Sequence, residues 1–117
     1  MAVATSKPAD AALTLELHGF LADRLRALGN RRGSRTLVSL TVPRGATVAS
    51  TLTELVSADD RYALLFDATA QALPEHVEVV LNDRVLDLQG GLGAMLEPGD
   101  VLRFLPAHAG GAPSPNP

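Results

Sequence analysis

The chain contains no cysteine among its 117 residues. Without thiols it can have no disulfide, no cysteine nucleophile, no dithiol redox pair and no cysteine-ligated zinc. The absence of disulfides fits a cytoplasmic protein, and that is the compartment we predict. A single domain of this length buries about 65% of the surface of its unfolded chain, so it can form a core without disulfides or a metal.

Aromatic residues are scarce, at 3% of the chain, and tryptophan is absent. Hydrophobic residues nevertheless make up 46%, so the core must be built from leucine and valine, with contributions from Phe20, Phe66, Phe104 and Tyr62. Lys7 is the only lysine and lies near the N-terminus. The folded core therefore offers no lysine for an isopeptide bond.

Long apolar runs are also missing, since no run approaches the roughly 18 residues of a membrane span. The first residues lack the basic start and apolar centre of a signal peptide, and we expect residues 1–11 to form a disordered leader. The net charge is −3, yet residues 24–35, RLRALGNRRGSR, are strongly basic. Because no aromatic residues are interleaved with these arginines, a solvated loop is favoured over nucleic-acid binding. We expect neither nucleic acid nor membrane as a partner.

Five segments have the alternating or compact apolar pattern of β-strands. They are residues 13–19, 36–42, 76–83, 84–88 and 101–105. The last is apolar enough to predict a central place in the sheet. Pro106 follows it and has no N–H to donate, so we expect main-chain pairing to stop there. Asn82-Asp83 and residues 97–100 are expected to be tight turns.

One apolar stripe at helical spacing predicts the main helix, over residues 48–56, with Thr47 as its N-cap. A second short helix is expected over residues 61–73, capped by Asp59 or Asp60. The glycine-rich segment 29–34 is expected to be a loop. One amphipathic helix needs one face of a sheet to cover it. The sequence therefore predicts an α+β fold, a four- to five-stranded mixed sheet with one main helix and a second short one.

Several motifs together resemble the small sulfur-carrier proteins of the MoaD/ThiS type. They are two opening strands, a helix after GAT, the strand–turn VVLNDRVL, and LEPGDVLRFLPAHAGG near the C-terminus. The resemblance spans residues 13–111, and its most specific part is the final strand, a proline, a short spacer and two glycines. It implies a ubiquitin-like β-grasp domain over residues 12–106 and a flexible tail over residues 107–117.

Members of that family are not enzymes themselves. The resemblance implies that an adenylating partner activates the C-terminal glycine with Mg-ATP, that a sulfur donor converts it to a thiocarboxylate, and that a synthase, such as a molybdopterin synthase, accepts the sulfur. Gly111 would carry the thiocarboxylate, and Gly110, Ala109, His108 and Pro106 would present it. A glycine without Cβ can enter a narrow active site. No cofactor is expected to bind this chain itself.

The segment APSPNP, residues 112–117, departs from the family pattern. Gly111 has no free carboxylate while these residues remain. The resemblance implies a precursor that a metalloprotease cuts between Gly111 and Ala112, and a proline-rich run is easily reached by a protease. In the alternative, the tail stays in place and the protein is a non-catalytic β-grasp interaction module.

The sheet face opposite the main helix is where partners of β-grasp carriers dock. The residues expected on it are Thr14, Glu16, Leu37, Ser39, Thr41, Glu78, Val80 and Arg103. Leu37 and Val80, joined by Phe104 or Leu102, are expected to form a modest apolar docking patch there.

Other motifs do not point to catalysis. The three histidines lack the spacing of metal ligands, and Asp59-Asp60 is better explained as a helix cap than as an acid–base pair. Gly90-Gly91 is not followed by the Lys-Ser/Thr of a phosphate-binding loop. Because no nucleophile, base and orienting group can be assembled, a freestanding enzyme is disfavoured.

Overall fold

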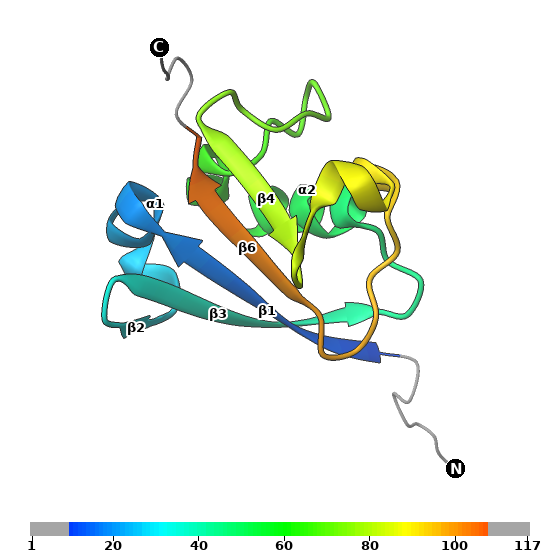
Figure 1. Cartoon of the computed structure of the whole chain (residues 1–117), viewed down its shortest axis with the longest axis horizontal. Coiled ribbons are helices and arrows are strands. Elements are labelled where there is room, and N and C mark those ends of the chain that lie inside the picture. The colour runs from blue at the N-terminus through cyan, green and yellow to red at the C-terminus, as the bar shows by residue number, and fades with distance from the viewer. Residues whose placement is uncertain (1–9, 108–117) are drawn as a thin grey trace.

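Six strands form one mixed sheet in the order β2-β3-β1-β6-β4-β5 in the computed structural model, which describes residues 10–107 (Figure 1). The strands are β1 (Asp10–His18), β2 (Asn30–Arg32), β3 (Arg35–Pro43), β4 (Val77–Leu81), β5 (Arg84–Val85) and β6 (Val101–Pro106). β1 and β6 run parallel, and the other pairs are antiparallel. The predicted central position of the last strand is confirmed, since β6 lies between β1 and β4.

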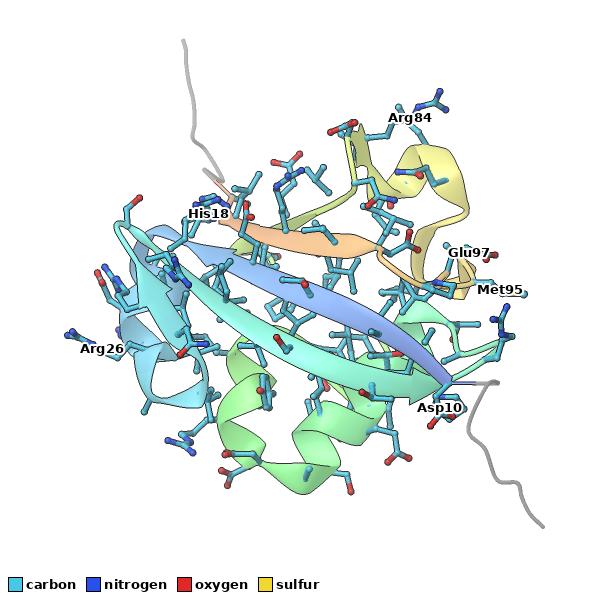
Figure 2. All side chains as sticks on the ribbon, turned by 90° about the horizontal axis from the view of Figure 1, so that it is seen from below. Asp10, His18, Arg26, Arg84, Met95 and Glu97 are labelled. Atoms are coloured by element: carbon cyan, nitrogen blue, oxygen red, sulfur yellow. The ribbon has the colours of Figure 1, made fainter. Side chains whose placement is uncertain are left out.

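One main helix, α2 (Val48–Ala58), covers one face of this sheet (Figures 1 and 2). A shorter helix, α1 (Gly19–Arg24), follows β1. Single 3₁₀ turns occupy Arg26–Leu28, Asp60–Leu64, Leu86–Gln89 and Gly91–Gly93. The mixed sheet with one main helix confirms the predicted α+β, β-grasp fold, but the sheet has six strands and not the four or five that were predicted. None of the helices within residues 10–107 is long and apolar enough to cross a membrane.

The predicted N-cap of the main helix is confirmed. The Thr47 hydroxyl accepts a hydrogen bond from the Ser50 N–H at 3.0 Å, and the Ser50 hydroxyl accepts one from the Thr47 N–H at 2.9 Å. This reciprocal pair satisfies two N–H groups that the first helical turn leaves without partners. It fixes where α2 begins and so which of its sides meets the sheet.

The core lies between α2 and the facing side of the sheet. Its largest fully buried side chains include Leu15, Leu17, Leu52, Phe66, Leu102 and Phe104. β1 and β6 contribute alternate residues to it, because successive side chains of a strand point to opposite faces. No helix within residues 10–107 covers the opposite face of the sheet, which is called the open face below (Figure 2).

The helix expected over residues 61–73 is absent, and this prediction is wrong. The chain makes one 3₁₀ turn over Asp60–Leu64 and then reverses in a turn closed by two main-chain hydrogen bonds between Asp67 and Ala72. The Asp67 carboxylate accepts from the N–H groups of residues 69 and 70, which favours this turn over a continuing helix. Asp59 is the residue that caps the 3₁₀ turn, as one of the two predicted caps.

The segment expected to be a loop over residues 29–34 contains the short edge strand β2, which explains the sixth strand. Arg32 pairs with Arg35 across the two-residue turn Gly33-Ser34, and Gly33 adopts φ 61°. An edge strand can lack an apolar face, and the polar residues of β2 therefore showed no pattern from which a strand could be predicted. The predicted turns after β4 and before β6 are confirmed by φ values of 58° at Asn82 and 88° at Gly99.

Both ends of the domain extend beyond the expected limits. Asp10 and Ala11, assigned above to the leader, belong to β1, where Ala11 is fully buried and pairs with Val42. At the other end, the N–H of Ala107 donates to the His76 carbonyl at 2.8 Å. Main-chain pairing therefore does not stop at Pro106. Only alternate residues of β6 direct their N–H and C=O groups toward β4, and Pro106 is not one of them, so its missing N–H costs no hydrogen bond to β4.

Candidate functional site

The described part of the chain ends at Ala107, directly after the central strand β6 (Figure 1). We call the surroundings of this point the tail base: Gly19, Phe20, His76, Pro106 and Ala107. The His76 carbonyl accepts from the N–H of Ala107, and His76 Nε2 lies 2.8 Å from the carbonyl oxygen of residue 64. The Phe20 ring, which is 39% exposed, lies against the His76 ring with centroids 5.8 Å apart. His76 thus fixes Ala107 relative to two other segments, one at residue 64 and one at Phe20.

Gly19 allows the ring of Pro106 to pack directly against the main chain in the tail base. Its φ is 60°, and a Cβ at this position would lie 2.6 Å from Cγ of Pro106. That distance is well inside van der Waals contact, and a proline ring cannot swing away. Only glycine permits both the left-handed backbone and the packing of Pro106 against it.

We expect Gly19→Ala to lower the free energy of unfolding by about 2–4 kcal/mol, from left-handed strain of about 1–2 kcal/mol plus the clash with Pro106. Gly33→Ala is the matched control, because Gly33 has φ 61° and no atom lies within 4 Å of the place that its Cβ would take. Gly33→Ala should lower the free energy of unfolding only by the left-handed strain of about 1–2 kcal/mol. Urea unfolding of both variants measures the difference, and equal losses would mean that Pro106 moves aside without cost.

The predicted site residues fall into two groups. Gly111, Gly110, Ala109 and His108 lie outside the residues that the structure describes. Pro106 is the last residue of β6, packed on Gly19 as described above.

The predicted apolar docking patch is wrong in one member and in its continuity. Phe104 is fully buried on the helix side of the sheet, as is Leu102, because even-numbered residues of β6 point to the core. Leu37 and Val80 are half-buried on the open face. They are not neighbours in the sheet. Leu37 pairs with Glu16 across β3 and β1, Glu16 with Arg103 across β1 and β6, and Arg103 with Val80 across β6 and β4, so two charged residues lie between them.

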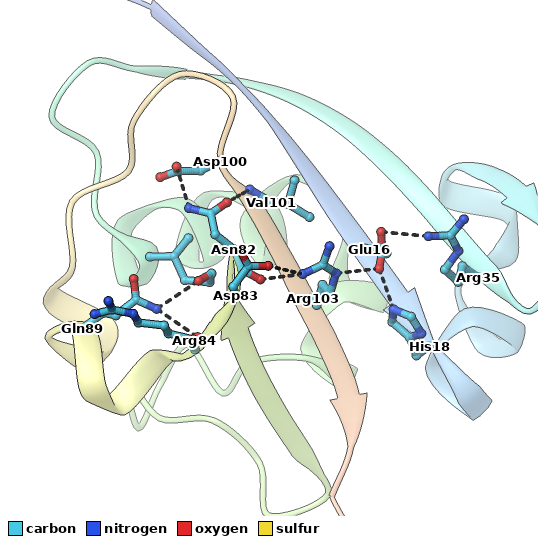
Figure 3. A network of polar contacts seen from close by, with 11 residues as sticks. Glu16, His18, Arg35, Asn82, Asp83, Arg84, Gln89, Asp100, Val101 and Arg103 are labelled. Atoms are coloured by element: carbon cyan, nitrogen blue, oxygen red, sulfur yellow. Dashed lines mark hydrogen bonds and ion pairs between the residues drawn. The ribbon is translucent and has the colours of Figure 1, made fainter.

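A cluster of charges fills the space between them (Figure 3). Oε1 of Glu16 lies 2.8 Å from both Arg103 Nε and His18 Nε2, and Oε2 lies 3.2 Å from Arg35 Nη1. Arg103 also donates to the Asn82 carbonyl. We call Glu16, His18, Arg35 and Arg103 the Glu16 cluster. Glu16 is only 8% exposed, but the side chains of Arg35 and Arg103 are 45% and 35% exposed, so the centre of the open face is a half-buried ion cluster and not an apolar patch.

The surroundings of Glu16 change its acidity in opposite directions. Burial raises the pKa of Glu16, but hydrogen bonds from His18 and Arg103, with the charges of Arg103 and Arg35, outweigh burial and hold this pKa below its ordinary value. A carboxyl whose pKa is lower in the folded state stabilises the fold above its unfolded pKa. That contribution is lost as the pH falls through the folded pKa.

We therefore expect Glu16→Gln to lower the free energy of unfolding at pH 7 by about 1–3 kcal/mol, since two arginines lose their carboxylate. Its stability should also fall less steeply than that of the unchanged protein below about pH 4.5, near the ordinary pKa of a glutamate. Urea unfolding across this pH range measures both effects. Glu78→Gln is the control, because Glu78 is exposed on β4, and an identical acid response of all three proteins would contradict the assignment.

Within residues 10–107, no three His, Asp or Glu side chains gather where they could hold a metal ion.

Solved structures with this architecture place the fold among ubiquitin-like proteins. The HVO 2177 protein of Haloferax volcanii aligns over 93% of this chain and 94% of its own, with TM-score 0.69 and 22% identity. Small archaeal modifier protein 1 of Haloferax volcanii aligns over 84% and 99%, with TM-score 0.62 and 26% identity. Urm1 of Trypanosoma brucei aligns over 87% and 97%, with TM-score 0.52 and 25% identity. Among curated proteins, none matches this sequence.

The ThiS family model matches residues 29–111, from the turn before β2 to the second glycine of the tail. Members of this family are small carrier or modifier proteins, and they work with activating enzymes of the ubiquitin-activating type. The match covers well over half of the chain and every described element after α1 and the 3₁₀ turn that follows it. The chain therefore belongs to the ThiS family of ubiquitin-like sulfur-carrier and modifier proteins.

Proposed function

We propose that this protein is a sulfur carrier whose Gly111, once residues 112–117 are removed, is adenylated by a partner and converted to a thiocarboxylate. One observation carries the proposal: the family match ends at Gly111, directly after the glycine pair. Residues 112–117 therefore lie beyond the family's pattern, in the position of an extension.

The tail base supports this role. β6 is held on both sides by β1 and β4, and Ala107 is fixed by its hydrogen bond to His76. A partner that binds the domain therefore meets residues 108–111 at a defined starting point. Because a glycine has no Cβ, Gly110 and Gly111 can pass through a narrow channel to that partner's catalytic groups.

The chemistry divides between this chain and its partners. A metalloprotease would hydrolyse the Gly111–Ala112 bond and free the Gly111 carboxylate. That carboxylate attacks the α-phosphorus of ATP in the activating enzyme, and pyrophosphate leaves. The outer sulfur of a persulfide on a donor protein then displaces AMP from the acyl carbon and forms an acyl disulfide. A thiol of a partner cleaves the S–S bond of this acyl disulfide, which leaves the Gly111 thiocarboxylate and a disulfide on the partners. A synthase, of the molybdopterin or a related pathway, accepts the sulfur in the cytoplasm. The chain supplies the acyl group and the partners supply Mg-ATP and catalysis, so it is a carrier and not an enzyme.

Intact-mass analysis of the protein from its native host tests the proposal. We expect a species that ends at Gly111 and a second one heavier by the difference between one sulfur and one oxygen atom. If every molecule retains residues 112–117, the carrier function is wrong. The chain would then be a non-catalytic β-grasp interaction module with an unprocessed tail.

A further inference from the structure

The outer edge of β3 carries main-chain groups without partners. β2 pairs only with Arg35–Leu37, so residues 38–43 have a neighbour, β1, on one side alone. Arg32 and Arg35 flank a two-residue turn and form a hydrogen-bonded pair, so odd-numbered residues of β3 direct their main-chain groups away from β1. The N–H and C=O groups of Ser39 and Thr41 consequently point outward and have no hydrogen-bond partner among residues 10–107.

A groove lies directly beside this edge, between the end of β3 and the first turns of α2. Its volume is about 620 Å³. Val42, Ala46 and Thr51 contribute to its apolar lining, and Arg44 and Glu54 also line it. Thr51 is 3% exposed, and its hydroxyl is the only buried side-chain polar atom within residues 10–107 that has no hydrogen-bond partner. A buried hydroxyl without a partner costs stability unless something else satisfies it.

Positive charge is concentrated in the part of the chain that includes this edge. Residues 19–44 hold six arginines and one acidic residue, whereas the rest of the described chain holds three arginines and twelve acidic residues. Arg44 lies at the groove, and the β2–β3 hairpin carries Arg32 and Arg35 at the other end of the edge. Arg26, in the connection before β2, projects away from the domain (Figure 2). Glu54 shares the groove with Arg44, and Glu16 pairs with Arg35, so the net positive charge near this edge rests on Arg26, Arg32 and Arg44. This charge favours a negatively charged partner.

We propose that the β3 edge and this groove bind an extended acidic peptide segment of a partner protein, which adds to the sheet as a further strand. Outward N–H and C=O groups on alternate residues match an extended polypeptide. An apolar side chain of that peptide enters the groove over Val42 and Ala46, and an acidic side chain beside it meets Arg44. The peptide would lie away from the tail base, because Pro43 pairs with Asp10 at the start of β1. The site is therefore independent of the proposed function of Gly111.

Titration of the ¹⁵N-labelled full chain with two synthetic ten-residue peptides tests this proposal by NMR. Both have the same alternating valine and isoleucine centre; one is flanked by glutamates and the other by lysines. We expect the glutamate peptide to shift the amides of Ser39, Thr41 and Thr51 and to bind about tenfold or more tightly than the lysine peptide at low salt. Raising the salt concentration should reduce this preference.

Two substitutions separate main-chain pairing from charge. Thr41→Pro removes an outward N–H that no internal bond uses, and an edge strand tolerates proline at such a position. It should reduce binding to the limit of detection. Arg44→Glu, which leaves the backbone untouched, should weaken the glutamate peptide about fivefold or more. Arg84→Glu is the matched control, because Arg84 is exposed on β5 at the opposite edge of the sheet and should have no effect.

Other occupants of the edge would give different results. If the peptide shifts residues of the open face, such as Leu37 and Arg103, and leaves Ser39 and Thr41 unchanged, the site is wrong. Edge amides that shift with protein concentration alone would mean that a second copy of the chain occupies the edge. If a short oligothymidylate binds the chain more tightly than the glutamate peptide does, the ligand of these arginines is a nucleic acid and not a peptide. Each of these outcomes overturns the proposal.

Discussion

Replacing Phe104 by alanine is expected to lower the free energy of unfolding by about 3–5 kcal/mol, the usual cost of removing a buried phenylalanine. Phe104 is fully buried in the central strand, opposite Leu17 of β1 and Val79 of β4. Its ring fills space between the sheet and the other core side chains, which cannot close around the cavity that alanine leaves. Urea unfolding followed by circular dichroism measures the loss.

Leu37→Ala and Phe104→Leu are the matched controls. Leu37 is only half-buried and lies on the open face, so its truncation should cost about 1 kcal/mol or less. Phe104→Leu keeps most of the apolar volume and should recover more than half of the loss. If Phe104→Ala melts like the unchanged protein while it weakens a partner interaction, Phe104 acts at the surface after all and the structural assignment fails.

The sequence predicted the elements in which local pattern and tertiary packing agree. The apolar run that ends at Leu105 becomes the central strand, and the stripe from Val48 to Val56 becomes the helix that covers the sheet. Thr47 caps that helix as its position suggested. In these segments the hydrophobic period, the cap and the flanking turns all favour the same structure, which is when prediction from pattern is reliable.

Prediction failed where long-range contacts decided the structure. The spacing of Leu65 and Phe66 fits a helix, yet these residues follow a 3₁₀ turn and reach the core from the irregular segment after it. β2 is polar and pairs only along one edge, so nothing in its composition marks it as a strand. Phe104 was expected in the core from composition and also in the docking patch, because the sequence does not show which alternate side chains of β6 face α2.

The Glu16 cluster shows the same limit at the candidate site. Alternation places Glu16 and Arg103 on the open face, but they are 87 positions apart in the chain. Only the parallel register of β1 and β6 makes them neighbours. A charged pair of this kind has no local signature, and the apolar residues Leu37 and Val80 attracted attention in its place.

The largest expected effect on activity concerns the position of the terminal carboxylate. A chain that ends at Gly111 should support ATP–pyrophosphate exchange by the host's activating enzyme, whereas the full-length chain and a chain that ends at Gly110 should not. Removing Gly111 withdraws the carboxylate by about 3.5 Å, the length of one extended residue. Because a misplacement of about 1 Å can reduce a rate about hundredfold, exchange should fall by at least that factor.

Two further measurements distinguish this explanation from a change in the fold. The described core and its last main-chain hydrogen bond, at Ala107, precede all of the altered positions, so the melting temperatures of the three chains should agree. Gly111→Ala in the shortened chain keeps the carboxylate in place but adds a Cβ, and it should therefore retain more activity than the chain that ends at Gly110. Equal exchange by chains that end at Gly110 and Gly111 would show that the activating enzyme does not read the position of this carboxylate, and Gly111 would lose its assigned role.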